Sequence, residues 1–406
     1  AEMQGQPNYL CVLPWHDAQE AENLGVEKGL AVSDAPCMVG FKCPVRNQCN
    51  YYIDLAKAGR SKIVATTYAY QLRSMGDINE ADWIIADEGH FLASHDSQAH
   101  KVELPVQSIE QLKTAYLHAK GMYDRIEEPT ARKRVLARYI DNLQLGLTLL
   151  TEEPQLMDVP PVNGLWTLQP TTTSFVQGVI TSKKRLVIMS ATILDPELYA
   201  LINNISQYEY IKLPWQFPAY SRPIYYIPQA KVNRDTYPIV DGPLARGVEW
   251  VLKERPNVKG LIHSVSFDLA QRVYNALGED TKERVILHQS GMNRHQLLQA
   301  FREVDAPVWI MSPGFGEGED FPYDAARSQI ILKIPYPNLG DPWVRRMRDK
   351  FKKWYLYTTA QSLWQMYGRV CRADDDFGDT FILDQNFENI VKDKQLIPKE
   401  IEDAIV

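Results

Sequence analysis

The sequence lacks the features of a membrane or secreted protein. Its 406 residues contain no apolar run close to the ~18 residues that a membrane helix needs. The N-terminal stretch Ala-Glu-Met-Gln-Gly has neither a basic region nor an apolar core, so it does not have the pattern of a secretory signal. We therefore expect a cytoplasmic protein with no membrane partner, long enough for two or three domains.

The chain also lacks an excess of positive charge. Its formal net charge is −7, which argues against a protein that coats polyanions, because such a domain is basic overall. A local basic groove around a single nucleic-acid strand stays open, since the field of such a groove acts over a Debye length of about 8–10 Å.

Cysteine is scarce and unevenly placed. Of five cysteines, four lie in the first 49 residues, namely Cys11, Cys37, Cys43 and Cys49, and Cys371 stands alone. A secreted disulfide scaffold is shorter and richer in cysteine, so the four favour metal ligands. No C-x₂₋₄-C pair of the kind typical of structural zinc sites is present, because the gaps between successive cysteines are 25, 5 and 5 residues. Cys371 is predicted to be a buried packing residue.

A phosphate-binding loop of the form G-x-x-x-x-G-K-[ST] is missing as well. None of the 22 glycines is followed by lysine. The chain by itself therefore has no backbone loop and lysine of the kind that hold nucleotide β- and γ-phosphates.

What is present is a repeated α/β pattern. Short apolar strands run directly into polar or glycine-rich residues after residues 86, 189, 262 and 311. In open α/β sheets, ligands bind at the carboxyl ends of the strands, so this pattern predicts a nucleotide site. Residues 105–150 have apolar residues at helical spacing. The stretch 213–223 carries three prolines in eleven residues and is the predicted domain linker.

The most informative motif is Asp87-Glu88-Gly89-His90, which follows a predicted strand. An Asp at a strand end is suited to hold Mg²⁺ against nucleotide phosphates, and the adjacent Glu is suited to orient and deprotonate water. His90 would connect this site to the next strand. Taken alone, a solvated acidic turn is an equally good interpretation.

Three further motifs follow in the chain. The hydroxyls of Ser190-Ala191-Thr192 are predicted to bond the acidic tetrapeptide and to link hydrolysis to a domain movement. In the glycine-rich loop 314–320, Glu317 and Asp320 would receive a ribose hydroxyl or pair with arginine. In the last motif, which runs from Gln365 to Arg372, Arg369 and Arg372 share one face of a predicted helix and are suited to clamp phosphoryl oxygens. For these motifs a strand-end turn, a mobile loop and a salt-bridged surface helix are the alternatives.

The order of these four motifs is that of motifs II, III, V and VI of superfamily-2 helicases. Asn8-Tyr9-Leu10-Cys11, the later cysteines, the segment 63–72 and the stretch 317–322 resemble the XPD/DinG-like iron–sulfur helicases. This resemblance covers nearly the whole chain. It implies a motor that hydrolyses ATP with Mg²⁺ and moves 5′→3′ on single-stranded or forked DNA.

The resemblance also implies an architecture and a cofactor. We expect an α/β protein with two RecA-like parallel-sheet domains, the first incomplete, a cysteine-cluster insert and a small helical arch. The corresponding ranges are 1–60 for the cysteine region, 61–95 with 181–215 for domain 1, 96–180 for the arch and 216–406 for domain 2. Cys11, Cys37, Cys43 and Cys49 would hold a [4Fe–4S] cluster, with zinc as the alternative and unliganded core thiols third.

The resemblance assigns roles to individual residues. Asp87 would serve the metal, Glu88 the water, and Arg369 and Arg372 the γ-phosphate. The residues that it implies as catalytic are Asp87, Glu88, His90, Gln365, Arg369 and Arg372, and those that it implies as nucleotide-binding are Glu317, Gly318 and Asp320. The coupling residues would be Ser190, Ala191 and Thr192. The nucleic acid would be contacted by Lys57, Arg60, Thr67, Tyr68, His263, Ser264, Arg345 and Arg346.

Two points qualify this interpretation. The basic and aromatic stretch 343–357 suits a single strand, but the spacing of Trp343, Met347 and Phe351 favours a buried helix face for the aromatic residues. The missing phosphate loop implies that an N-terminal segment or another chain carries it. A catalytically silent nucleic-acid-binding or scaffold subunit with the helicase fold is the alternative function, although Glu88 and the two arginines argue against it.

Overall fold

The structure is a computed structural model that describes most of the chain. It describes all residues except 1, 4–7, 25, 33–34, 40–41, 74–81, 128–129, 155, 157–163, 175, 177, 180–183, 214–216 and 316–318. The chain forms two compact units. Unit 1 contains Ala1–Ser190 and Ala200–Gln207, and unit 2 contains Ala191–Tyr199 and Tyr208–Val406. The predicted four-part division is finer than these two units and stays a prediction.

Unit 2 is built on a six-stranded parallel sheet. The strand order is β7-β12-β11-β8-β10-β9, and every pairing is parallel. The strands are β7 (Ile224–Ala230), β8 (Gly260–His263), β9 (Val285–Leu287), β10 (Trp309–Ser312), β11 (Ser328–Ile331) and β12 (Asp379–Asp384). The central strands β8, β10 and β11 are buried at every residue. This pattern is expected for parallel strands, because helices cover both faces of such a sheet.

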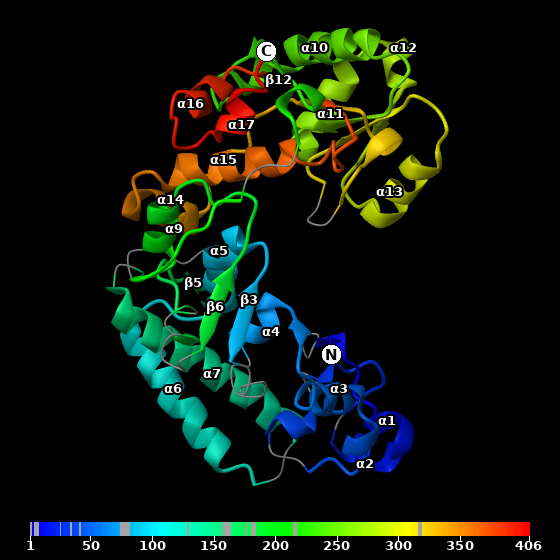
Figure 1. Ribbon diagram of the computed structural model, residues 1–406. Coiled ribbons are helices and arrows are strands. Elements are labelled where there is room, and N and C mark those ends of the chain that lie inside the picture. The colour runs from blue at the N-terminus through cyan, green and yellow to red at the C-terminus, as the bar shows by residue number, and fades with distance from the viewer. Residues whose placement is uncertain are drawn as a thin grey trace. The chain divides into compact units, whose positions relative to one another are not determined.

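Helices connect the strands of unit 2 in the order that the sequence predicts (Figure 1). They are α10 (Asp241–Glu254), α11 (Phe267–Ala276), α12 (Glu279–Lys282), α13 (Arg294–Glu303), α14 (Pro342–Lys350), α15 (Trp354–Tyr367), α16 (Phe387–Val391) and α17 (Lys399–Glu402). Helix α9 (Pro196–Ile202) precedes them. The predicted α/β class with a parallel sheet is thus confirmed.

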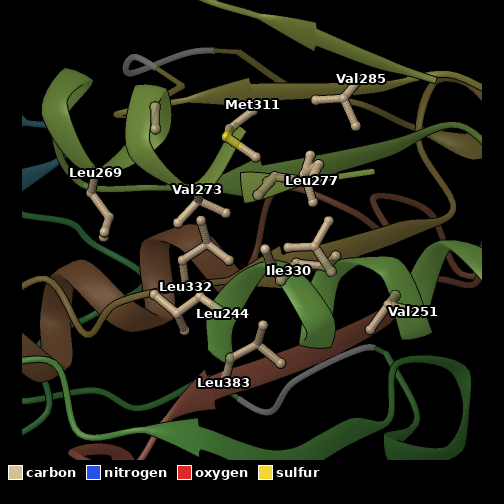
Figure 2. Packing of buried hydrophobic residues seen from close by; sticks show 14 of the residues in the cluster. Leu244, Val251, Leu269, Val273, Leu277, Val285, Met311, Ile330, Leu332 and Leu383 are labelled. Carbon is tan, nitrogen blue, oxygen red and sulfur yellow. The ribbon is translucent and has the colours of Figure 1, made fainter. Parts of the chain in front are cut away.

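The main core of unit 2 lies between the sheet and helices α10 and α11 (Figure 2). Leu244, Val248 and Val251 face it from α10 at helical spacing, and Leu269 and Val273 face it from α11. This spacing places the apolar side chains on one face of each helix. At the start of β8, a Cβ on Gly260 would collide with the ring of Trp309, so glycine is required for the close approach of the two strands.

The described part of unit 1 contains three two-stranded sheets. β1 (Glu2–Met3) pairs parallel with β2 (Ala65–Thr66), β3 (Trp83–Ala86) pairs parallel with β6 (Arg185–Ile188), and β4 (Val102–Leu104) pairs antiparallel with β5 (Trp166–Leu168). The shorter helices are α1 (Leu13–His16), α2 (Ala18–Asn23), α3 (Asn50–Ala58), α4 (Tyr68–Arg73) and α5 (Leu92–Ala99).

The predicted helical region is a pair of helices, α6 (Ile109–Asp124) and α7 (Ala131–Glu152), which lie side by side (Figure 1). Ser108 and Thr130 cap their N-termini by accepting backbone N–H groups. Leu104, Leu112, Leu143 and other apolar residues form one core between these helices and the β4–β5 pair. None of the helices in the described part of the chain is both long enough and apolar enough to cross a membrane.

Candidate nucleotide-binding and nucleic-acid-binding sites

The acidic tetrapeptide lies at the carboxyl end of β3, as the sequence predicts. Asp87 and Glu88 are exposed, and Glu88 adopts a left-handed backbone with φ 48° and ψ 40°. The side chain of Asp87 accepts the Glu88 amide at 2.9 Å. This turn is uncommon for a residue other than glycine, and it ends the strand with both carboxylates at the surface. Carboxylate oxygens there are suited to a magnesium ion and its waters.

Tyr68 supports the same strand end from α4. Its phenol donates to the carbonyl oxygen of Asp87 at 2.6 Å. Burial, together with the nearby charges of Asp87 and Glu88, raises the pKa of Tyr68 to about 12. The phenol therefore remains a donor at neutral pH. Tyr68 also stacks on His95, with ring centroids 5.1 Å apart.

His90 connects the acidic motif to the neighbouring strand. Its Nδ1 atom lies 2.8 Å from the hydroxyl of Ser190 and 3.3 Å from a carboxylate oxygen of Glu88. The amide of Gly89 donates to the carbonyl of Met189 at 2.8 Å, so the parallel pairing of β3 and β6 continues into the motif. The predicted contact between the His and the Ser-Ala-Thr segment is present. It joins a candidate hydrolytic group to a second strand end.

Thr192 belongs to unit 2, and its contacts are with α15. The Nε2 atom of Gln365 donates to the Thr192 hydroxyl at 3.1 Å, and Gln361 donates to the Thr192 carbonyl at 2.9 Å. The prediction placed both hydroxyls of the segment on the acidic tetrapeptide. Ser190 has that contact, whereas Thr192 is buried against the helix that leads to the arginine motif. Gln361 has no counterpart among the predicted site residues.

Arg369 and Arg372 follow the end of α15 rather than lying inside a helix. Arg369 donates to the carbonyl of Glu319 at 3.0 Å, and Arg372 lies 3.1 Å from a carboxylate oxygen of Asp320. The predicted pairing of Asp320 with an arginine is therefore present. The helical face predicted for the two arginines is wrong, because α15 ends at Tyr367 and Cys371 has φ 62°. Glu317 and Gly318 lie outside the described residues.

Asp376 holds this segment in place. Its buried carboxylate accepts the amides of Arg372 at 2.9 Å and Tyr323 at 3.0 Å, and it pairs with Arg327 at 2.6 Å. Asp376 is not among the predicted site residues, and its burial is seen only in the structure. Its position as the last of three consecutive aspartates gives no signal of it. Cys371 is buried, as predicted.

The predicted nucleic-acid residues differ in exposure. Lys57, Arg60, Thr67 and Arg345 are exposed and Arg346 is partly buried. His263 and Ser264 are 1% and 0% exposed. Their side chains therefore do not form a nucleic-acid surface in the arrangement described, and the contact proposed for them is not retained.

A groove of about 590 Å³ in unit 1 has three basic side chains in its lining. It is lined by Arg46, Asn47, Tyr52, Ile53, Leu55, Ala56, Lys57 and Arg60. The guanidinium of Arg46 lies 4.0 Å from the ring centre of Tyr52. Cationic groups beside an aromatic ring suit the phosphates and bases of a single strand. Met347 on α14 and Phe351 at its C-cap are buried, and Trp343 at its start is partly buried, which agrees with the predicted apolar face.

The four N-terminal cysteines converge on one region. Cys11 and Cys49 are buried, and Cys37 and Cys43 are half-buried. Burial raises the pKa of the Cys11, Cys37 and Cys43 thiols, and electrostatic interaction between every pair of the four raises these values further. Among the described residues, however, no three His, Cys, Asp or Glu side chains are grouped so as to hold one metal ion.

Comparison with known proteins points to helicases. Residues 249–404 match the family model of the helicase C-terminal domain. The chain is 23% identical over 167 residues to the 3′-5′ exonuclease DinG of Staphylococcus aureus strain bovine RF122 / ET3-1, and 23% identical over 166 residues to that of strain MSSA476. The first match covers 38% of this chain and 19% of the relative, and the second 38% and 18%. The chain thus matches about a fifth of the length of these curated relatives.

Solved structures agree on the fold. An XPD helicase structure has a TM-score of 0.64 at 16% identity and covers 98% of this chain and 84% of its own. The Xpd4 structure from S. tokodaii has a TM-score of 0.53 at 16% identity, covering 83% and 81%. The parallel-sheet fold is that of RecA-like helicase domains in XPD structures. The chain is similar to XPD/DinG-like helicases in fold and, over residues 249–404, to helicases in sequence.

Proposed function

We propose that the chain is the main part of an ATP-dependent DNA helicase that moves 5′→3′ on single-stranded or forked DNA. The observation that carries the proposal is the strand-end site in unit 1, where Asp87 and Glu88 are exposed and His90 bonds Ser190. A left-handed backbone at Glu88 is uncommon for a residue other than glycine. This conformation and the bond from His90 to the next strand end favour a functional site over a simple surface turn. The similarity to helicases supports the same conclusion.

The proposed reaction is hydrolysis of ATP. Asp87 binds Mg²⁺, which neutralises charge on the β- and γ-phosphates when it is bound. Glu88 accepts a proton from water as the water oxygen bonds the γ-phosphorus and the bond to the β-phosphate oxygen breaks, which yields ADP and phosphate. Arg369 and Arg372 stabilise charge on the transferred group. Glu317, Gly318 and Asp320 contact the ribose or the arginines, and Gln365 holds Thr192.

The loop that binds the phosphates is proposed to reside on an N-terminal segment or on another chain. The chain has the acid, the carboxylate proposed to orient water and the arginines, but no lysine in a glycine loop. Such a loop and lysine contribute most of the grip on the β- and γ-phosphates. We therefore expect the 406-residue chain alone to bind single-stranded DNA without hydrolysing ATP.

The nucleic-acid contacts are proposed to come from dispersed basic and aromatic groups. Lys57 and Arg60 line the groove of unit 1, Thr67 and Tyr68 lie beside the acidic motif, and Arg345 and Arg346 lie on α14. Phosphates are gripped by cations at many points, and bases stack on aromatic rings. This distribution explains how an acidic protein binds DNA.

The cysteines are proposed to hold a [4Fe–4S] cluster. Two of the four thiols are buried and two are half-buried, and Cys11, Cys37 and Cys43 belong to one hydrophobic cluster. Four cysteines are the number that ligation of a four-iron cluster requires. The resemblance to the iron–sulfur helicases supports this choice over zinc.

Substitution of Glu88 tests the function. In the complete protein, Glu88→Gln removes the carboxylate that accepts the proton, so DNA-stimulated phosphate release is expected to fall about 10²- to 10⁴-fold. Binding of single-stranded DNA is expected to stay within about twofold, because that contact is dispersed. Glu103→Gln, an exposed carboxylate on β4, is the matched control. Undiminished hydrolysis by Glu88→Gln would reject the role of this site, and a complete protein without any hydrolysis would favour the silent scaffold.

A further inference from the structure

Gln329 is a polar residue in the middle of an apolar sheet. It lies in β11, between β12 and β8, and is 0% exposed. Burial of an amide without partners costs free energy, so such a residue needs its hydrogen bonds. Gln329 has three. Its Nε2 atom donates to the carbonyl of Tyr367 at 3.0 Å and to the hydroxyl of Thr380 at 2.9 Å, and its Oε1 atom lies 3.0 Å from Nε2 of His263.

The first of these bonds leads to the arginine motif. Tyr367 is the last residue of α15, and the final carbonyls of a helix have no partner within the helix. Gln329 supplies that partner from the sheet. Two residues later, the carbonyl of Arg369 accepts the amide of Phe321 at 3.2 Å, and its guanidinium bonds the carbonyl of Glu319. The bond from Gln329 therefore fixes the end of α15, and the end of α15 in turn fixes the position of the Arg369 backbone.

The Tyr367 carbonyl fixes the orientation of the Gln329 amide, and His263 bonds its oxygen. The Tyr367 carbonyl only accepts, so the NH₂ group of Gln329 must face it and the Gln329 oxygen must face His263. His263 then carries its proton on Nε2. Its ring is buried at the end of β8, with an edge-to-face contact to Phe315 at 4.9 Å between centroids. The orientation follows from the fixed polarity of one backbone carbonyl.

We propose that Gln329, bonded to both Tyr367 and His263, is a positioning residue that holds Arg369 in place for phosphoryl transfer. This inference rests on the proposed function of Arg369. A purely structural role is the alternative, since a buried polar pair also stabilises a fold. The two roles predict different ways to reverse the effect of a substitution. Lost stability is regained when no buried polar group is left unpaired. Lost activity is regained only when the bond to Tyr367 is restored.

Two variants and a control separate these roles. Gln329→Met keeps the length of the side chain but removes the amide and leaves His263 without this partner. The double variant Gln329→Met/His263→Phe replaces the Gln329–His263 pair by apolar groups, which removes the unpaired His263 ring without restoring the bonds to Tyr367 and Thr380. Ser328→Ala is the control, because Ser328 is the adjacent buried residue and its hydroxyl has no hydrogen-bond partner among the described residues.

The measurements are kcat and KM for ATP in the complete protein with saturating single-stranded DNA, together with the melting temperature. We expect Gln329→Met to lower kcat about 10- to 100-fold, as displacement of a reacting group does, with KM changed less than about threefold. The double variant is expected to regain the melting temperature but not kcat. Ser328→Ala is expected to behave as the parent protein.

Two results would overturn the inference. One is a normal kcat in Gln329→Met, and the other is recovery of both kcat and melting temperature in the double variant. Arg369→Ala is measured alongside. If that variant hydrolyses ATP normally, the proposed function of Arg369 fails, and the inference fails with it. If Arg369→Ala is inactive while Gln329→Met is normal, only the positioning role is rejected.

Discussion

The Nδ1 atom of His90 lies 2.8 Å from the hydroxyl of Ser190, and this contact joins the ends of two parallel strands, β3 and β6. Glu88, two residues before His90, lies within 3.3 Å of the same nitrogen. Glu88 is thus connected to Ser190 through a single side chain, that of His90. The segment that continues from Ser190 reaches Thr192, which bonds α15.

Removal of the Ser190 hydroxyl is expected to separate hydrolysis from movement. Ser190→Ala takes away the bond to His90 but no group of the proposed reaction. Unwinding by the complete protein is expected to fall about tenfold or more, while ATP hydrolysis falls less than about threefold, since a neutral hydrogen bond is worth about 0.5–1.5 kcal/mol. Parallel unwinding and phosphate-release assays test this. Ser190→Thr, which keeps the hydroxyl, serves as the control, and an equal loss of both activities would contradict the coupling role.

The two arginines are expected to be required for catalysis and not for DNA binding. Arg369→Ala and Arg372→Ala should each abolish unwinding by the complete protein, because stabilisation of phosphoryl charge by arginine is worth roughly 10³–10⁵ in rate. Single-strand affinity should change little. Arg348→Ala is the control, since Arg348 is a partly exposed arginine on α14 that pairs with Asp349. Near-normal unwinding in both variants would return these arginines to a structural role.

The stability of the protein is expected to fall in mild acid through His263. Burial lowers the pKa of His263 to about 4, and the nearby charge of Arg369 lowers it as well. The unfolded chain takes up this proton near pH 6.5 and the folded one does not, so stability is full above pH 6.5 and declines toward pH 4. Between pH 7.5 and pH 5 the loss from this residue is about 2 kcal/mol.

Urea unfolding at the two pH values measures this loss. His263→Phe removes the titrating group and is expected to lower the difference between pH 7.5 and pH 5 by about that amount. His295→Phe, a change at another histidine in unit 2, controls for general effects of losing a histidine. An unchanged difference in the His263 variant would show that the folded protein takes up this proton as readily as the unfolded chain, and would reject the lowered pKa of His263.

The cysteines are expected to bind iron. Anaerobically purified protein should be brown and contain about four irons per chain, as ligation of one cluster by four cysteines requires. Cys43→Ser should lose most of the iron, whereas Cys371→Ser, which alters the buried cysteine of the arginine motif, should retain it. Iron and zinc analysis of the three proteins provides the test, and stoichiometric zinc without iron would reject the cluster.

The alternation of apolar strands and polar ends was sufficient to predict the parallel α/β sheet. This prediction succeeds because the pattern is local. A buried parallel strand is a continuous apolar run, as in residues 309–311 of β10. Ligand-binding residues follow the carboxyl end of a parallel strand directly, as Asp87 and Glu88 follow the apolar strand β3. The contact of His90 with Ser190 was predictable for the same reason, since each lies just beyond the end of one of two paired strands.

Contacts between distant segments were decided only by the tertiary structure. Gln329 lies 38 residues from Tyr367 and 66 from His263, and its run of apolar neighbours predicts a strand without naming a partner. Asp376 has the same side chain as its two acidic neighbours but alone is buried. Thr192 follows Ser190 closely yet bonds Gln365, 173 residues away. Such pairings depend on which strand ends and helix ends the packing brings together. The local sequence pattern around each residue does not specify its distant partner.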